Sequence, residues 1–118
     1  MNKEDLIRKT QSHAISLLRD KGYISSVDII MKLGYLSQAD YEKWRRGQVD
    51  YLERVCKCNL KKLSLINKTI RNLAREKNLK ASRIVYSRWG KGPKKILRFS
   101  KSGQSIIESG YSTHYVQR

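Results

Sequence analysis

Residues 57–101 have the sequence KCNLKKLSLINKTIRNLAREKNLKASRIVYSRWGKGPKKILRFSK, and this stretch decides the fold. Its first half is periodic at helical spacing, with Asn59 as a good N-cap, and predicts a helix over about 60–78. Its second half is β-branched and aromatic on both sides of a Gly-Lys-Gly-Pro break, and predicts a β-hairpin over about 83–100 with a basic tip. A helix followed by a hairpin is the closing part of a winged helix-turn-helix domain.

The residues before this stretch predict further helices. Apolar side chains recur on one helical face over about 4–21, where Gly22 marks the stop, and start signals precede two more segments over about 26–33 and 38–56. The last of these is one helix or is divided at Gly47, because glycine costs a helix interior about 1 kcal/mol relative to alanine. The tail 111–118 is not assigned to an element. The predicted fold is therefore mainly α with a C-terminal β-hairpin (α+β), a winged helix-turn-helix-like single domain over 1–118.

The charge is strongly segregated along the chain. The 118 residues hold 26 Lys and Arg against 10 Asp and Glu, a net charge of +16. Fifteen of the basic residues lie in 57–101 with Glu76 as the single acid, so these 45 residues carry +14. The like charges of such a block repel one another and destabilise the compact state unless a polyanionic partner neutralises them. We therefore expect 57–101 to form a nucleic-acid-binding surface, with no membrane and no small-molecule substrate as partner.

The predicted helix 60–78 has one apolar face and one polar face. At 100° per residue Leu63, Ile66 and Ile70 gather on the apolar side. Arg and Lys can bond guanine, and Asn can bond adenine, when several such groups project together into the major groove. The alternative is an ordinary solvated helix face, although such a face usually includes acids. The residues predicted to face duplex DNA are Ser64, Asn67, Lys68, Arg71, Asn72 and Arg75.

The predicted hairpin adds a second set of candidates. Lysines at its tip suit a sequence-independent hold on phosphates, although lysines on a hairpin can also serve only to prevent edge-to-edge aggregation. Its aromatic residues could stack on single-stranded bases if exposed, which would favour an RNA-binding or ribosome-associated protein, but such rings are more often core. The basic candidates are Arg83, Arg88, Lys91, Lys94, Lys95, Arg98 and Lys101, and the stacking candidates are Tyr86, Trp89 and Phe99.

Catalytic and metal-binding patterns are weak. The Gly-Lys-Gly at 90–92 does not fit a Walker motif, and Cys56, Cys58 and two histidines do not form a paired C-x-x-C zinc pattern. A nuclease would need converging carboxylates, and the basic block offers only Glu76, while His114 has no evident catalytic partner. We predict a protein that is not an enzyme, with no cofactor and no metal; a phosphodiesterase or nuclease is the second alternative.

The start of the chain and its two cysteines predict a cytoplasmic protein. No signal-peptide pattern or bilayer-length apolar run is present, and two closely spaced cysteines suit a reducing compartment. A DNA-binding protein there would be nucleoid-associated. The sequence leaves open whether it forms a homodimer.

Three stretches carry a resemblance: WRRGQVDYLERV at 44–55, RWGKGPKKILRFSKSG at 88–103 and THYV at 113–116. They resemble a family of small basic bacterial proteins that has no assigned function. The resemblance covers most of the chain and implies a bacterial, cytosolic protein. It implies neither a fold nor a site.

Overall fold

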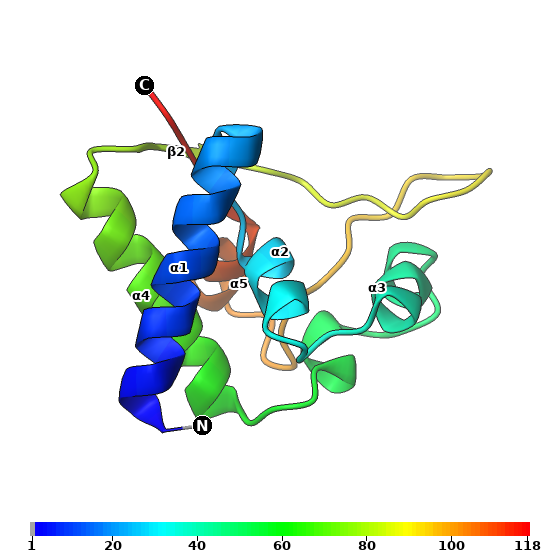
Figure 1. Cartoon of the computed structure of the whole chain (residues 1–118). Helices are drawn as coiled ribbons and strands as arrows, with labels where there is room; N and C mark the ends of the chain where they lie inside the picture. The colour runs from blue at the N-terminus through cyan, green and yellow to red at the C-terminus, as the bar shows by residue number, and fades with distance from the viewer. Residues whose placement is uncertain (1) are drawn as a thin grey trace.

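The chain folds into five α-helices, one short 3-10 helix and three short strands, as seen in a computed structural model that describes residues 2–118 (Figure 1). The α+β class predicted from the sequence is confirmed. In chain order the elements are α1 (Lys3–Lys21), β1 (Tyr23–Ile24), α2 (Ser26–Lys32), α3 (Gln38–Arg45), the 3-10 helix η1 (Leu52–Val55), α4 (Leu60–Glu76), β2 (Lys80–Arg83), α5 (Ser105–Ser112) and β3 (Thr113–Val116).

Four of the α-helices begin at a side chain that caps them. In each case an Asn or Ser oxygen accepts a hydrogen bond from the backbone N–H three residues later, which satisfies one of the free donors of the first turn. These distances are 2.8–3.1 Å, and the caps are Asn2, Ser25, Ser37 and Asn59. α4 ends two residues before the predicted boundary because Asn78 adopts a left-handed conformation, with φ 54°.

Of the two alternatives predicted for 38–56, the single helix is wrong and the division at Gly47 is confirmed, because α3 stops at Arg45. Gly47 takes φ +77°, outside the helical region, and its N–H bonds to the carbonyl of Trp44. The chain then turns back and forms only the short η1. The glycine therefore divides this segment, and the second piece is one turn of 3-10 helix instead of an α-helix.

The predicted hairpin over 83–100 is also largely wrong. Its two arms do meet: the N–H of Arg88 bonds to the carbonyl of Lys95, the N–H of Leu97 bonds to that of Tyr86, both at 2.8 Å, and Ser87 and Ile96 form an isolated bridge. The ladder is too short to count as two strands. We call residues 84–99 the paired loop.

The three-stranded sheet has the order β1-β3-β2, and both pairings are antiparallel. Its central strand is β3, formed by residues of the tail that the sequence left unassigned. Val116 lies opposite Tyr23 on one side and Lys80 on the other. The true partner of β2 is therefore β3 and not the second arm of the paired loop.

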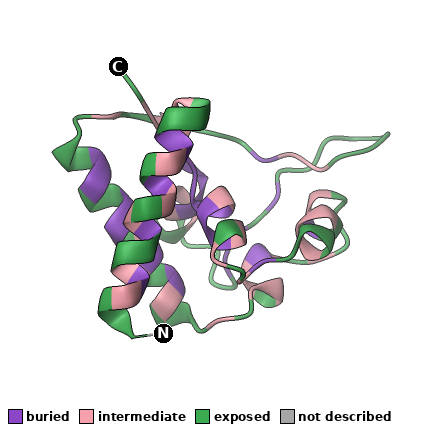
Figure 2. Ribbon diagram, in the orientation of Figure 1, coloured by how far each residue is buried: buried purple, intermediate pink, exposed green. Residues whose placement is uncertain are grey.

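The core has an aliphatic part and an aromatic part. α1 and α4 lie side by side and bury aliphatic residues against each other and against α2 (Figures 1 and 2). The aromatic part surrounds Trp44, which is fully buried and donates from Nε1 to the carbonyl of Arg98 at 2.9 Å. This part ties α3 to the paired loop. Within residues 2–118 no helix combines the length and apolar character that crossing a bilayer requires.

Candidate nucleic-acid interface

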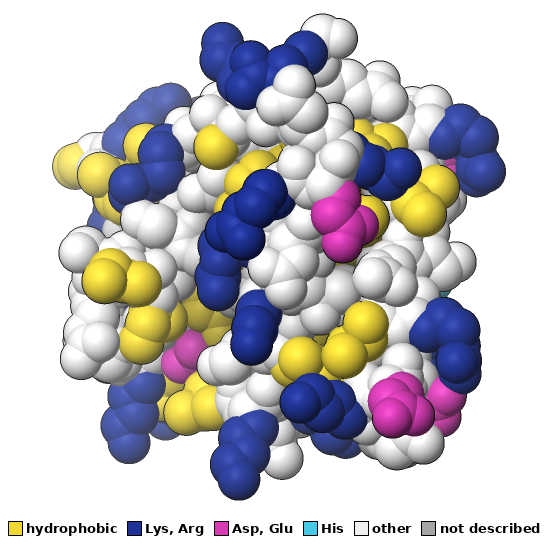
Figure 3. All heavy atoms as spheres, turned by 90° about the vertical axis from the view of Figure 1, so that its left-hand side faces the viewer, with side chains coloured by type: hydrophobic (Ala, Val, Ile, Leu, Met, Phe, Trp, Pro, Cys, Tyr) yellow, Lys and Arg dark blue, Asp and Glu magenta, His cyan; other side chains and the backbone are white. Residues whose placement is uncertain are grey.

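The outward side of α4 is polar and basic. Its inward residues, Leu63, Ile66 and Ile70, are at most 2% exposed, so the opposite side is free to meet a partner. Figure 3 looks toward the left side of Figure 1, where α4 lies, and shows Lys and Arg side chains gathered down the middle of this face. Five of the six predicted groove-facing residues are exposed there: Ser64, Lys68, Arg71, Asn72 and Arg75.

Asn67 is the sixth predicted residue, and it has a structural role. It is half-buried, and its Oδ1 accepts a hydrogen bond from the hydroxyl of Ser26 at 2.5 Å. Ser26 is buried at the start of α2, so this bond fastens α4 to α2. The amide of Asn67 lies at the edge of the basic side, and its oxygen is already occupied.

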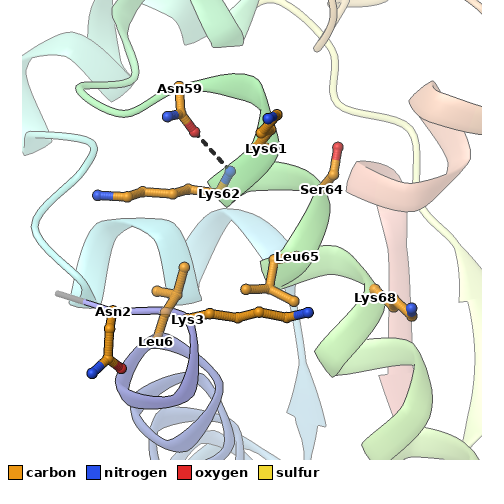
Figure 4. Close-up of a pocket in the computed structure, with 9 residues that line it drawn as sticks. All are labelled: Asn2, Lys3, Leu6, Asn59, Lys61, Lys62, Ser64, Leu65 and Lys68. Atoms are coloured by element: carbon orange, nitrogen blue, oxygen red, sulfur yellow. Dashed lines mark hydrogen bonds between the residues drawn. The ribbon is translucent and has the colours of Figure 1, made fainter.

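A groove of about 450 Å³ runs along one flank of α4, between its first half and the start of α1 (Figure 4). Lys3 of α1 extends past Leu65 and points toward Lys68. Lys61 and Lys62 line the same groove. None of these three lysines was among the predicted groove-facing residues, and only the packing of α1 on α4 brings Lys3 to this side.

A second groove, of about 620 Å³, runs along the other flank of α4, toward α5. Lys101 and Arg71 both line it, so the structure brings this predicted lysine to α4. Ile106, which is 86% exposed, also lines this groove. We call the basic residues of α4 and of its two flanks the α4 face, in which Lys62 is half-buried and the other residues are exposed: Lys3, Lys61, Lys62, Lys68, Arg71, Arg75 and Lys101.

The cations of the basic block have no acidic partners in the described chain. Five ion pairs occur within residues 2–118, and the basic member of each lies before residue 55. None of the fifteen Lys and Arg side chains of 57–101 takes part. Those pairs join Arg8 to Asp5, Arg19 to Asp20, Lys21 to Asp28, Arg46 to Glu42 and Arg54 to Asp50.

Two glutamates near the α4 face are engaged by backbone groups. Glu108 accepts from the N–H groups of Phe99 and Ser100, at 2.9 and 2.7 Å, and from the hydroxyl of Ser100. Glu53 accepts from the N–H of Lys101 at 3.0 Å and from the hydroxyl of Tyr111 at 2.7 Å. These carboxylates fix the segment 99–101 instead of pairing with side-chain cations.

The paired loop carries a separate basic tip. Lys91, Lys94 and Lys95 are exposed, and the guanidinium of Arg88 holds the turn by donating to the carbonyls of Lys91 and Pro93 at 3.3 and 3.1 Å. Arg88 is therefore a structural residue of this turn. In Figure 1 the tip extends to the right, at the opposite end of the molecule from α4. The structure does not bring the two predicted parts of the basic block together.

The remaining predicted arginines lie between these two ends. Arg83 is exposed at the end of β2. Arg98 is exposed, and its guanidinium lies 5.5 Å from the centre of the Tyr51 ring. Neither lines the grooves beside α4.

The predicted stacking residues are mostly buried. Tyr86 is 8% exposed and Phe99 is 3% exposed, because both pack around Trp44. This burial removes them as stacking platforms. Trp89 is 41% exposed, but the Arg45 guanidinium lies 4.8 Å from the centre of its ring and the Tyr41 ring meets it edge-on.

The cysteines and histidines considered for catalysis or metal binding are half-buried, and Glu76 is exposed. Burial raises the pKa of Cys56 to about 12, so its thiol stays protonated near neutral pH. His114 stacks on Tyr23 and hydrogen-bonds the Tyr86 hydroxyl through Nε2 at 3.0 Å. In the described residues no three His, Cys, Asp or Glu side chains converge as metal ligands would.

Comparison of the chain with models of protein families, with curated proteins and with solved structures finds no match.

Proposed function

We propose that this protein binds nucleic acid, and duplex DNA in particular, through the α4 face. The observation that carries the proposal is the set of cations around α4 that no acid of the described chain pairs with. Seven positive groups on one helix and its two flanks repel one another in the free protein. A phosphate backbone relieves that repulsion and releases counterions when it binds.

The order of elements supports a winged helix-turn-helix origin for the fold. β1 separates α1 from α2, α4 is the last helix before the second strand, and the third strand pairs between the other two. α4 then has the place of a recognition helix. α3 and η1 lie between α2 and α4, and the paired loop and α5 replace a simple wing.

The geometry of α4 suits a groove. Its 17 residues make a rod of about 25 Å, and a major groove about 12 Å wide admits one helix. Lys68, Arg71 and Arg75 follow one another at spacings of three and four residues, so they project from one side. Arg71 and Asn72 can bond base edges, while the flanking lysines hold phosphates on both sides of the groove.

RNA recognition by stacking remains the alternative proposal, and it now depends on Trp89 alone. Comparing Arg71→Ala with Trp89→Ala therefore separates the two models. We expect Arg71→Ala to weaken binding to duplex DNA by about 1–3 kcal/mol, while Trp89→Ala leaves it unchanged. Fluorescence anisotropy with duplex DNA, single strands and structured RNA at one salt concentration measures this, and Lys32→Ala, an exposed lysine of α2, is the charge-matched control.

The salt dependence of binding tests the electrostatic part of the proposal. If the α4 face neutralises about five phosphates, log affinity should fall against log salt with a slope of about −4 to −5. An affinity for duplex DNA that does not change with salt, or that Arg71→Ala leaves intact, would contradict the proposal.

A further inference from the structure

We infer that the tip of the paired loop is a second, separate phosphate-binding surface, and that the protein joins two segments of nucleic acid. This inference rests on the proposed function of the α4 face and extends it. The tip surface consists of Lys91, Lys94 and Lys95, held on the turn that Arg88 fastens.

The tip is built as a fixed structure. Gly90 and Gly92 adopt φ of +110° and +106°, where other residues are strained, and the Arg88 side chain closes the turn from inside. The tip is also anchored at its base, because the N–H of Trp89 bonds to the carbonyl of Arg45 at 2.6 Å. The three lysines therefore project from a supported turn, which lowers the entropy lost when they bind.

The chemistry of the tip suits a polyanion. Its lysines have no acidic partner in the part of the chain that the structure describes, and the ion pair nearest in sequence joins Arg54 to Asp50. A lysine is a point charge on a flexible stem, which contacts a phosphate without reading the base. The same partner that neutralises the α4 face would neutralise this surface, with less sequence discrimination.

The two surfaces face different ends of the molecule. α4 forms the left edge of Figure 1, the tip projects to the right, and the core lies between them. The longest dimension of the molecule is 40 Å. Duplex DNA has a persistence length of about 150 base pairs, and bending 20–30 base pairs by 40–90° already costs about 1–6 kcal/mol. One short duplex therefore reaches one surface, and the second surface is left for another segment.

A capture experiment tests this inference. A duplex of about 14 base pairs, too short to bend around the protein, is fixed to beads, protein is added at low salt, and a fluorescent duplex of the same sequence is offered. We expect the bead-bound protein to retain the fluorescent duplex. The tip variant Lys91→Gln, Lys94→Gln, Lys95→Gln should bind a single duplex within about twofold of the wild type and retain at least about tenfold less of the second.

Two further variants make the result specific. The first, Lys9→Gln, Lys32→Gln, Lys43→Gln, removes the same charge from exposed lysines outside both surfaces and should capture as the wild type does. The second, Lys68→Gln, Arg71→Gln, Arg75→Gln, changes the α4 face and should lose affinity for the single duplex by at least about tenfold. Circular dichroism and thermal unfolding verify that each variant folds.

Three outcomes would overturn the inference. If the tip variant captures the second duplex as well as the wild type, the joining is due to self-association or to an unrelated surface, and sedimentation of the free protein separates these two causes. If the tip variant loses single-duplex affinity as strongly as the α4 variant does, the two ends act as one surface. If the wild type binds single duplexes but captures no second one, the tip does not hold nucleic acid. Failure of the proposed function is distinct, because it appears as an α4 variant that binds the single duplex like the wild type.

Discussion

At the scale of single residues, two acids determine how positive the basic half of the molecule stays. Glu53 and Glu108 accept hydrogen bonds from backbone N–H groups of 99–101, so neither forms an ion pair with a lysine or arginine of the α4 face. Charge-assisted hydrogen bonds of this kind are stronger than neutral ones. The two carboxylates thus stabilise the fold beside a surface on which acids would compete with phosphate.

Replacing Glu108 with alanine should destabilise the protein. The change leaves two part-buried N–H groups, of Phe99 and Ser100, without their acceptor, and we expect the free energy of unfolding to fall by about 3 kcal/mol. Glu108→Gln keeps one acceptor oxygen and should lose less. Urea unfolding measures both, and Glu76→Ala, which changes an exposed acid, should stay within about 0.5 kcal/mol of the wild type. Equal stability of Glu108→Ala and Glu76→Ala would show that the carboxylate of Glu108 is dispensable.

His114 should make the stability depend on pH. Burial lowers the pKa of His114 below its ordinary value of 6.5, although Asp28 acts in the opposite direction. The unfolded chain then binds a proton more readily than the folded one, so the free energy of unfolding should decrease as pH falls through about 6.5. The decrease continues down to the folded pKa.

Thermal unfolding between about pH 7.5 and pH 5.5 measures this effect in the wild type and in His114→Gln. Because the variant also loses the contacts with Tyr23 and Tyr86, it should be less stable at every pH. The informative quantity is the change with pH, which should be smaller in the variant. The pKa of His13 is also lowered, by burial first and then by Lys32 and Lys9, so His13→Gln serves as the comparison. If the pH dependence of stability in His114→Gln is as large as in the wild type, a group other than His114 causes it.

At the scale of elements, helices could be predicted from the sequence because their determinants are local. Caps such as Ser25 and Asn59 act on N–H groups three residues away, and the apolar period of α4 placed Arg71 and Arg75 on its exposed side correctly. Asn67 fits the same period, and only the position of Ser26 on another helix shows that its amide is engaged.

The strands could not be predicted in this way. A run of β-branched residues suggests a strand but does not identify its partner, because pairing depends on residues far along the chain. Residues 83–100 therefore suggested a hairpin, although in this segment Tyr86, Leu97 and Phe99 are buried in the core. Lys3 and Lys101 show the same limit for the candidate site, because packing alone sets their distance from α4.

At the scale of the whole molecule, the charge should limit stability in the absence of a partner. The chain carries +16, and the fifteen cations of 57–101 have no ion pairs in the described residues. The Debye length shortens from about 30 Å at 0.01 M salt to about 8 Å at 0.15 M, so added salt screens this repulsion. The five ion pairs that salt also weakens are exposed and contribute about 0–1 kcal/mol each.

We therefore expect sodium chloride to stabilise the free protein. Raising its concentration from about 0.01 M to about 0.15 M should increase the free energy of unfolding by about 1 kcal/mol, which corresponds to a rise in Tm of about 4 °C. Thermal unfolding followed by circular dichroism gives this value. The tip variant, with three fewer charges, should show a smaller rise. A Tm that falls with salt would mean that attractive pairs outweigh the repulsion.

The central position of β3 sets the order in which the fold can be completed. β1 and β2 do not pair with each other; each pairs with β3, whose residues 113–116 follow both of them in the chain. During synthesis the helices α1 to α4 can form and pack while both of these strands still lack a partner. Closing the long loop from Tyr23 to Val116 costs entropy that grows with loop length, and pairings so distant in sequence form slowly. The sheet is therefore expected to close last, and until then the nascent chain exposes two unpaired strand edges to its neighbours on the ribosome.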